Sequence, residues 1–260
     1  MPSEDLIYEV RDSIGHVIFN RPAARNAFTI DMYTSLAEIC AQAPTDGSVK
    51  AIIMTGAGDK AFGSGTDMTQ FRGFATSQDA WGYEDKMEGV LSRIERCPVP
   101  TIAAINGACT GGGAAIAACC DIRLTTANLK FGFPIARTLG NCLSVNNLRR
   151  LSDLLGKGRV HEIMLTARLI EAPEALAIGL VSEVVDTVDT LQVRAGLIAE
   201  SIAANAPLTM RATKEGLRRI GEASSAIDDR DLIEMCYMSE DFKEGMEAFL
   251  SKRKPEWKGR

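Results

Sequence analysis

A short apolar segment that runs into three consecutive glycines constrains the fold of this chain more than any other feature. Residues 99–105 are apolar, which is typical of a strand buried on both faces. Gly111, Gly112 and Gly113 follow, and the small residues at 114–120 predict a helix. Because strand–turn–helix successions of this kind recur along the chain, the sequence predicts an α/β fold built in layers.

The elements expected around this segment follow the same scheme. Period-two alternation or short apolar runs predict strands at 6–10, 15–20, 51–54 and 122–125. Apolar residues at helical spacing predict helices at 29–43 and 78–96. No fixed short repeat or low-complexity tract is present.

The C-terminal quarter lacks segments that resemble strands. From Thr190 onward the pattern is mostly helical, and Pro207 is suited to the first turn of a helix. A last helix carries one apolar face, made of Phe242, Met246, Phe249 and Leu250. We therefore predict a core at 1–195 and a helical region at 196–260, whose apolar surface would suit oligomerisation.

Charge and composition exclude several classes of partner. The net charge of −5 provides no general basic field for nucleic acid. No apolar run is long enough to span a bilayer, and the N-terminus does not read as a signal peptide. Two histidines do not make a histidine-rich metal site, and no metal is expected. Seven cysteines without metal spacing read as buried free thiols, which predicts a cytoplasmic protein.

Two glycine-bearing turns are the segments best suited to chemistry. The first glycine corner, residues 62–67, follows the strand at 51–54, and the second glycine corner is residues 111–113. Glycine lets backbone approach a ligand closely, and a helix start presents unpaired N–H groups. Side by side, such turns could direct two N–H donors at one oxygen and form an oxyanion hole. Each turn alone is better explained by tight packing.

In the order of its motifs, the chain resembles the enoyl-CoA hydratase/isomerase (crotonase) family over nearly its whole length. The segments that carry the resemblance are 20–27, 60–68, 100–107, 111–113, 118–123, 131–134, 177–181 and 242–249. The resemblance implies an α/β spiral of repeated ββα turns. It also implies C-terminal helices that build a homotrimer, often a dimer of trimers.

The resemblance also implies roles for individual residues. The backbone N–H groups of Thr66 and Gly112 would bind the oxygen of a coenzyme A thioester, so coenzyme A enters as part of the substrate and no separate cofactor is expected. The residues expected along coenzyme A are Ala23, Ala24, Arg25, Ser64, Gly65, Thr66, Asp67 and Met68. Phe249 and Lys252 of a neighbouring subunit would lie near the nucleotide. Alternatively, residues 252–254 are a solvated charged end, and Asp67 is a loop or cap residue.

Two departures from the family pattern affect the expected reaction. Family hydratases use two glutamates to place and activate water, and the matching positions here are Ala115 and Ile135. Neither side chain can move a proton. The nearby candidates for replacement chemistry are Arg137 and Asn141, together with Cys142 and Ser144. Arg137 could instead pair with Asp67, and Cys142 could simply be packed.

The helix expected at 78–96 offers further acidic and hydroxyl groups, namely Tyr83, Glu84 and Glu88. The two glutamates are spaced i, i+4, which also suits a solvated helix face. We predict an enzyme of fatty acid metabolism. It would stabilise the enolate of an acyl-CoA, as a hydratase or isomerase does. The alternatives are decarboxylation, thioester hydrolysis, or acyl-CoA binding without catalysis.

Overall fold

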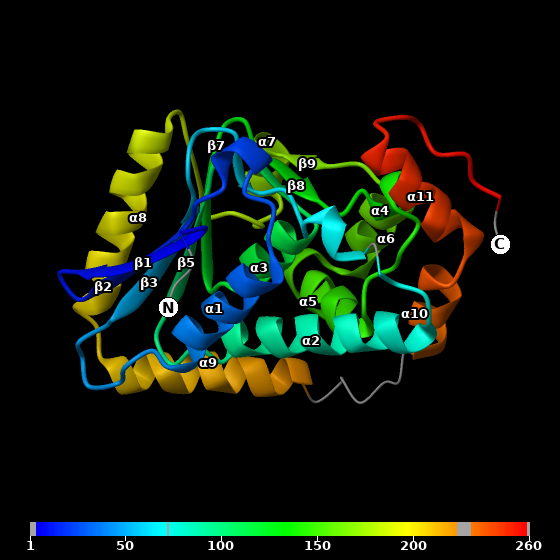
Figure 1. The fold of residues 1–260 in the computed structure, drawn as a ribbon. Coiled ribbons are helices and arrows are strands. Elements are labelled where there is room, and N and C mark those ends of the chain that lie inside the picture. Colours follow the sequence, from blue (N-terminus) through cyan, green and yellow to red (C-terminus); the bar gives the residue numbers. More distant parts are fainter. Residues whose placement is uncertain (1–3, 72, 223–229, 259–260) are drawn as a thin grey trace.

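The structure, a computed structural model, describes residues 4–71, 73–222 and 230–258. Within these residues the strands form two sheets, and helices pack around them (Figure 1). The larger sheet has the order β1-β2-β3-β5-β7-β10 and the smaller one the order β4-β6-β8-β9. The expected α/β class is therefore confirmed.

The chain enters the larger sheet through a hairpin. Strands β1 (Leu6–Arg11) and β2 (Ile14–Phe19) pair antiparallel over their full length. Asp12 and Ser13 between them have φ values of 50° and 63°. Two left-handed residues give a tight turn whose twist matches that of the paired strands. The two expected strands are thus confirmed.

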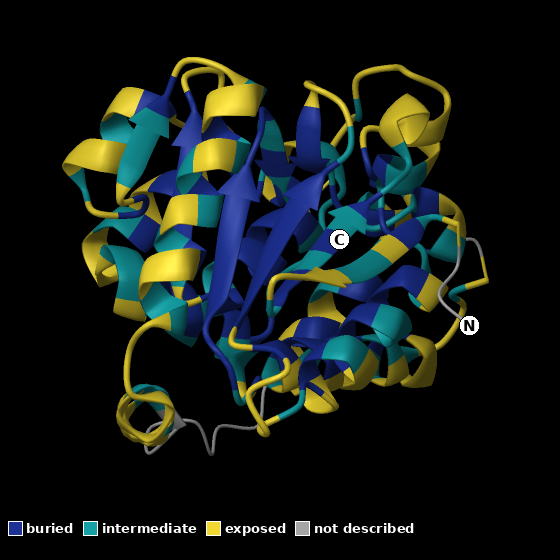
Figure 2. Ribbon diagram, turned by 90° about the vertical axis from the view of Figure 1, so that its left-hand side faces the viewer, coloured by how far each residue is buried: buried dark blue, intermediate teal, exposed yellow. Residues whose placement is uncertain are grey.

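The rest of the larger sheet is parallel. Strands β3 (Ala51–Gly56), β5 (Thr101–Ile105), β7 (Ile122–Thr126) and β10 (Glu183–Val185) join it in that order. Parallel strands covered on both faces need apolar residues throughout, which explains the continuous apolar runs. Figure 2 shows the central strands as a continuously buried layer. Strand β5 begins later than expected because Pro98 and Pro100 lack the N–H groups that a ladder needs.

Helix α8 (Val188–Ala203) covers one face of the larger sheet (Figure 1). Its buried residues Leu191, Ala195 and Ala199 pack on the strands. The boundary predicted between residues 195 and 196 therefore falls inside one continuous helix. Any division between core and C-terminal region lies after α8, because this helix belongs to the layer that covers the sheet.

The expected helices on the opposite face are confirmed, and their ends have identifiable caps. Helix α1 (Ile30–Ala41) starts at Thr29, whose hydroxyl accepts from the Met32 amide. Helix α2 (Ser77–Glu95) starts with a reciprocal cap between Thr76 and Asp79. Helix α3 (Gly112–Cys119) begins directly at the second glycine corner.

The smaller sheet was not anticipated, because its strands are only two or three residues long. They are β4 (Ala61–Gly63), β6 (Ala108–Thr110), β8 (Lys130–Gly132) and β9 (Ile170–Glu171). Strands β4 and β6 are parallel neighbours. Their carboxyl ends consequently lie at the same edge of the sheet, and both glycine corners start there.

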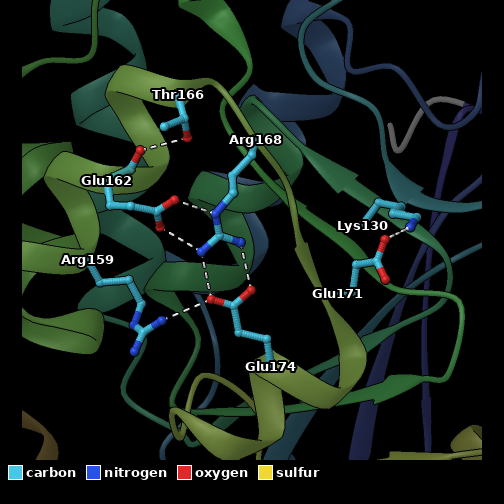
Figure 3. A network of polar contacts seen from close by, with 7 residues as sticks. All are labelled: Lys130, Arg159, Glu162, Thr166, Arg168, Glu171 and Glu174. Carbon is cyan, nitrogen blue, oxygen red and sulfur yellow. Dashed lines mark hydrogen bonds and ion pairs between the residues drawn. The ribbon is translucent and has the colours of Figure 1, made fainter.

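Three helices lie between β8 and β9 in the chain, namely α4 (Ile135–Thr138), α5 (Val145–Leu155) and α6 (Lys157–Thr166), and α7 (Ala172–Ala177) follows β9. Arg168 joins α6 to α7, because its guanidinium donates to Glu162 at 2.5 Å and to Glu174 at 2.7 Å (Figure 3). Arg159 donates to the same Glu174. These groups are partly solvated, so we assign them a positioning effect and little net stability.

Three helices form the C-terminal region: α9 (Pro207–Glu222), α10 (Arg230–Tyr237) and α11 (Glu240–Leu250). Pro207 is the first residue of α9, as predicted. Leu208, Leu217 and Ile220 of this helix are exposed. Helix α10 lies beside the far end of α2, and α11 lies next to α10 and α4 (Figure 1). Among helices within the described ranges, none combines the length and apolar character needed to cross a bilayer.

A buried arginine connects α5 to α2. Arg150 is 4% exposed and donates to both oxygens of Glu88, at 2.7 and 2.6 Å. It also donates to Glu95 at 2.8 Å. Glu88, one of the acidic candidates from the sequence, is therefore part of an ion pair that holds two helices together.

Replacing Arg150 by alanine should lower the free energy of unfolding by roughly 3 kcal/mol, because Glu88 would lose its cation in a largely buried setting and Glu95 would keep only Arg149. Urea denaturation at fixed protein concentration measures the loss. Arg219→Ala, which removes an exposed partner of Glu215, is the control and should have a much smaller effect. Equal effects of the two variants would contradict this account of Arg150.

Candidate functional site

The two glycine corners meet at the edge of the smaller sheet. A Cβ built on Gly112 would lie 3.6 Å from the Thr66 nitrogen, and one on Gly65 would lie 3.8 Å from the Gly112 nitrogen. Gly65 has a φ of 108°, which suits glycine alone. The parallel pairing of β4 and β6 explains the contact, because it places the ends of both strands side by side.

The backbone amides around the corners are mostly used to hold the loops. Asp67 N–H donates to the Phe28 carbonyl at 2.9 Å, and Gly111 N–H donates to the Gly132 carbonyl at 3.0 Å. Within the described ranges, the amides of Thr66 and Gly112 donate to no protein acceptor. Both residues line the same cavity. The geometry thus leaves two adjacent donors unengaged at one wall of a cavity.

This cavity has a volume of about 220 Å³ and mostly apolar walls. Its apolar lining includes Met68, Phe71, Met87, Phe133, Leu139 and Leu143. Ala115 and Ile135 also line it, so the positions that match the family glutamates do face this space. Glu84 contributes a carboxylate from α2 and is buried, which contradicts a solvated position for it.

Three hydroxyl groups form a chain along the wall beside the corners. The Thr66 Oγ1 atom lies 3.0 Å from the Tyr33 hydroxyl and 2.8 Å from the Tyr83 hydroxyl. Burial raises the pKa of Tyr33 above its ordinary value, more than the hydrogen bond to Thr66 lowers it. Burial and then the charge of neighbouring Tyr33 raise the pKa of Tyr83 as well. Both tyrosines are therefore neutral at physiological pH.

A second polar group lies on the same cavity. The Tyr237 hydroxyl of α10 donates to Glu84 Oε1 at 2.6 Å. The side-chain amide of Asn141 donates in turn to the Tyr237 oxygen at 3.3 Å. Burial, followed by the negative charge of Glu84, raises the pKa of Tyr237. Asn141, a candidate from the sequence, is thus on the cavity and linked to a carboxylate through one tyrosine.

The segments expected along coenzyme A lie together at the mouth of this region. The turn Pro22–Ala24, which contains Ala23 and Ala24, is exposed, and so is Arg25. Ser64 N–H donates to the Arg25 carbonyl at 3.1 Å. The loop that holds Ser64, Gly65, Thr66 and Met68 is therefore directly beside that turn.

Asp67 acts as the loop residue that one interpretation of the sequence anticipated. Its carboxylate accepts from the Thr69 amide and hydroxyl, at 3.1 and 2.8 Å, and from Arg21 at 3.1 Å. Burial opposes ionisation, but these hydrogen bonds outweigh it and lower the pKa of Asp67. Since Asp67 pairs with Arg21, the alternative ion pair between Asp67 and Arg137 is wrong.

Three other sequence candidates lie at or beyond the edge of the cavity. Arg137 is exposed and is not among the residues that line the cavity. Phe249 lines the cavity of its own chain and is also half exposed, so its contact with a neighbouring subunit stays a prediction. Lys252 is exposed, just beyond α11.

Two candidates near the lost second glutamate have local explanations. Cys142 lines the cavity and hydrogen-bonds to the Cys236 thiol of α10, which lowers the pKa of Cys236 to about 7. Ser144 is the N-terminal cap of α5 and accepts from the Asn147 amide.

Tyr33 and Tyr237 were missed in the sequence. Tyr33 lies on the buried face of α1 and reads there as a core residue, while Tyr237 comes from a short helix near the C-terminus. The available signal was weak: a hydroxyl-bearing aromatic residue among apolar neighbours needs a polar partner when buried.

Fold and site together define an α/β protein in which two backbone amides converge on a largely apolar cavity. The profile of one family, Enoyl-CoA hydratase/isomerase, matches residues 9–260. The chain belongs to this family.

Relatives and solved structures agree. The chain is 34% identical to a short-chain-enoyl-CoA hydratase from Clostridium acetobutylicum, over 98% of each chain. It is also similar to the crystal structure of an enoyl-CoA hydratase/carnithine racemase from Magnetospirillum magneticum, with a TM-score of 0.79, 34% identity, and 99% and 97% of the two chains covered. The structure of methylmalonyl-CoA decarboxylase in complex with 2-nitronate-propionyl-CoA matches with a TM-score of 0.89 at 27% identity, over 99% of both chains.

The contact between the corners predicts that Gly113 tolerates no side chain. A Cβ there would lie 2.2 Å from the Gly63 carbonyl oxygen, so Gly113→Ala must push β4 away from α3. We expect it to lower the free energy of unfolding by about 1–3 kcal/mol, measured by urea denaturation. Gly89→Ala on α2 meets no atom within 4 Å and should instead stabilise the protein slightly. A neutral Gly113→Ala would contradict the close packing.

Proposed function

We propose that this protein is an enzyme that binds acyl-CoA thioesters and stabilises an enolate formed next to the thioester carbon. The observation that carries the proposal is the pair of unengaged amides, Thr66 and Gly112, on one wall of the cavity. Preorganised donors in a cavity that excludes water act most strongly on a charge that develops during reaction. Such a charge develops on the thioester oxygen when it becomes the enolate oxygen.

The coenzyme A portion would follow the exposed turn at 22–25 and the loop at 64–68, which lie side by side. A separate hollow is lined by the same turn and by residues 57–61. Arg25 and Lys60 border it, and these cations suit the phosphates of a nucleotide. The family membership supports this arrangement, and the acyl group would then enter the cavity beyond Thr66.

The reaction that fits the family best is hydration or isomerisation of an enoyl-CoA. A second candidate is decarboxylation of an acyl-CoA that carries a carboxylate on its α-carbon. One observation favours it: Ala115 and Ile135 line the cavity and cannot activate water. Loss of carbon dioxide forms the enolate without a general base, so it requires only the amide pair and a proton donor. The similarity to methylmalonyl-CoA decarboxylase supports this candidate.

A panel of thioesters distinguishes these functions. Crotonyl-CoA tests hydration, methylmalonyl-CoA tests decarboxylation, and butyryl-CoA tests thioester hydrolysis, with products followed by mass spectrometry. We expect turnover of crotonyl-CoA or methylmalonyl-CoA. Binding of all three without any product would replace the enzyme by an acyl-CoA-binding protein, and no binding would refute the proposal.

The role of the amide pair has a matched test at Gly112. Any Cβ at this position meets the Tyr33 hydroxyl at 1.9 Å, so Gly112→Ala and Gly112→Pro disturb Tyr33 alike. Proline is tolerated at the first position of a helix, and it removes the N–H. We expect kcat of Gly112→Pro to be about 100-fold below that of Gly112→Ala, since one oxyanion donor is lost. Equal rates would show that this amide has no catalytic part.

We also propose a homotrimer, or a dimer of trimers, in a reducing cytoplasm. The exposed apolar residues of α9 and the family membership support the assembly, and the seven free thiols suit a reducing compartment. Leu217→Glu with Ile220→Glu should lower the mass measured by light scattering, because charge would enter a subunit contact. Val10→Glu on β1 is the control. An unchanged mass would exclude α9 from the contact.

A further inference from the structure

The hydroxyl chain of Tyr33, Thr66 and Tyr83 shares the cavity with Ala115 and Ile135, the two positions that lack an acid or base. All three residues line the cavity. Thr66 belongs both to this chain, through its side chain, and to the amide pair, through its backbone. A substrate oxygen held by the Thr66 amide would therefore be only a few bonds from the chain.

The number of protons in the chain decides what it can do. Each of the three hydroxyl groups carries one proton, and the two O···O contacts use two of them. Within the described ranges, neither tyrosine oxygen has another polar contact. One proton is left over. It belongs to one of the two tyrosines, or to Thr66 if both tyrosines donate to it, and the group that carries it is a donor without an acceptor in this chain of hydroxyls.

The exposure of the two ends identifies that donor. Tyr33 is 2% exposed. Its oxygen packs so closely against Gly112 that it would have to shift if Gly112 had a side chain. Tyr83 is only partly buried and comes from α2. We therefore infer the order in which Tyr33 donates to Thr66 and Thr66 donates to Tyr83, because this order leaves the Tyr83 proton free for the cavity. Both tyrosines stay protonated at physiological pH because burial raises the pKa of each.

We propose that Tyr83 is the proton donor to the enolate, with Thr66 and Tyr33 as the positioning residues that direct its proton. This inference rests on the proposed function, since it assumes that the Thr66 and Gly112 amides hold the thioester oxygen. The α-carbon is bonded directly to the thioester carbon. With the thioester oxygen on the Thr66 amide, the α-carbon would be within reach of the Tyr83 hydroxyl, which is 2.8 Å from the Thr66 side chain.

The transfer balances without any further reactant. The electron pair of the enolate forms a new C–H bond at the α-carbon while the Tyr83 O–H bond breaks. The Tyr83 oxygen then carries the negative charge, and the Thr66 hydroxyl stabilises that charge by donating a hydrogen bond to it. Water that enters the cavity after the product leaves returns a proton to Tyr83. A chain of this kind acts as an acid, which suits an enolate that forms by loss of carbon dioxide or by addition to an enoyl thioester.

The test compares two ligands that differ in charge at the reacting position. Propionyl-CoA is neutral there, and 2-nitronate-propionyl-CoA carries an anion in place of the enolate. Calorimetry gives the Kd of each ligand for the unmodified protein and for Tyr83→Phe. We expect the unmodified protein to bind the nitronate at least about tenfold more tightly than propionyl-CoA, because a hydrogen bond to a charged group is strong. Tyr83→Phe should lose about tenfold of that preference while its Kd for propionyl-CoA stays the same.

A matched pair at Thr66 tests the positioning role. Thr66→Val keeps the backbone amide and the shape of the side chain but removes the hydroxyl, whereas Thr66→Ser keeps the hydroxyl. The valine variant should lose part of the nitronate preference, and the serine variant should retain it. This pair also decides the question if Tyr83→Phe fails to fold, as judged by thermal unfolding.

The outcomes separate this inference from the proposed function. If the unmodified protein binds propionyl-CoA and Tyr83→Phe keeps the full nitronate preference, the donor role of Tyr83 is refuted and the proposed function stands. If the unmodified protein binds neither ligand, the proposed function fails, and the inference fails with it. Equal losses in Thr66→Val and Thr66→Ser would refute the positioning role.

Discussion

The parallel pairing of β4 with β6 is the contact on which the site depends. Each strand is only three residues long, yet together they bring residues 64–67 and 111–113 to the same point. Gly63 and Gly113 allow the backbones to touch there, with a separation that no side chain could occupy. The cavity, the amide pair and the start of α3 all derive their positions from this contact.

The polar groups of the cavity are arranged unevenly. On one wall, backbone amides and hydroxyls offer protons, and the positions where a family hydratase has glutamates are apolar. The carboxylate that does reach the cavity, Glu84, accepts a proton from Tyr237. Such a site donates hydrogen bonds more readily than it removes protons, which favours chemistry in which a negative charge arises on the substrate.

The sequence predicts the larger sheet and its helices well, because their apolar runs are long and their caps are distinct. Residues 78–96, for example, end within one residue of α2 at each side. The smaller sheet was beyond prediction, since two or three residues have no period. The same limit explains the site: the sequence places Thr66 and Gly112 in suitable turns, but Tyr33 reads as core until its contact with Thr66 is known. The exposed position of Arg137 likewise depends on a four-residue helix that no pattern marks.

Two helices near the C-terminus contribute side chains to the cavity, Tyr237 from α10 and Phe249 from α11. Their docking is therefore thermodynamically linked to occupancy of the cavity. Any molecule that contacts these side chains binds only the docked form, so it must reduce transient opening of the last two helices. The slowing of amide hydrogen exchange along 230–250 would thus report on ligand binding at a distance from the thioester itself.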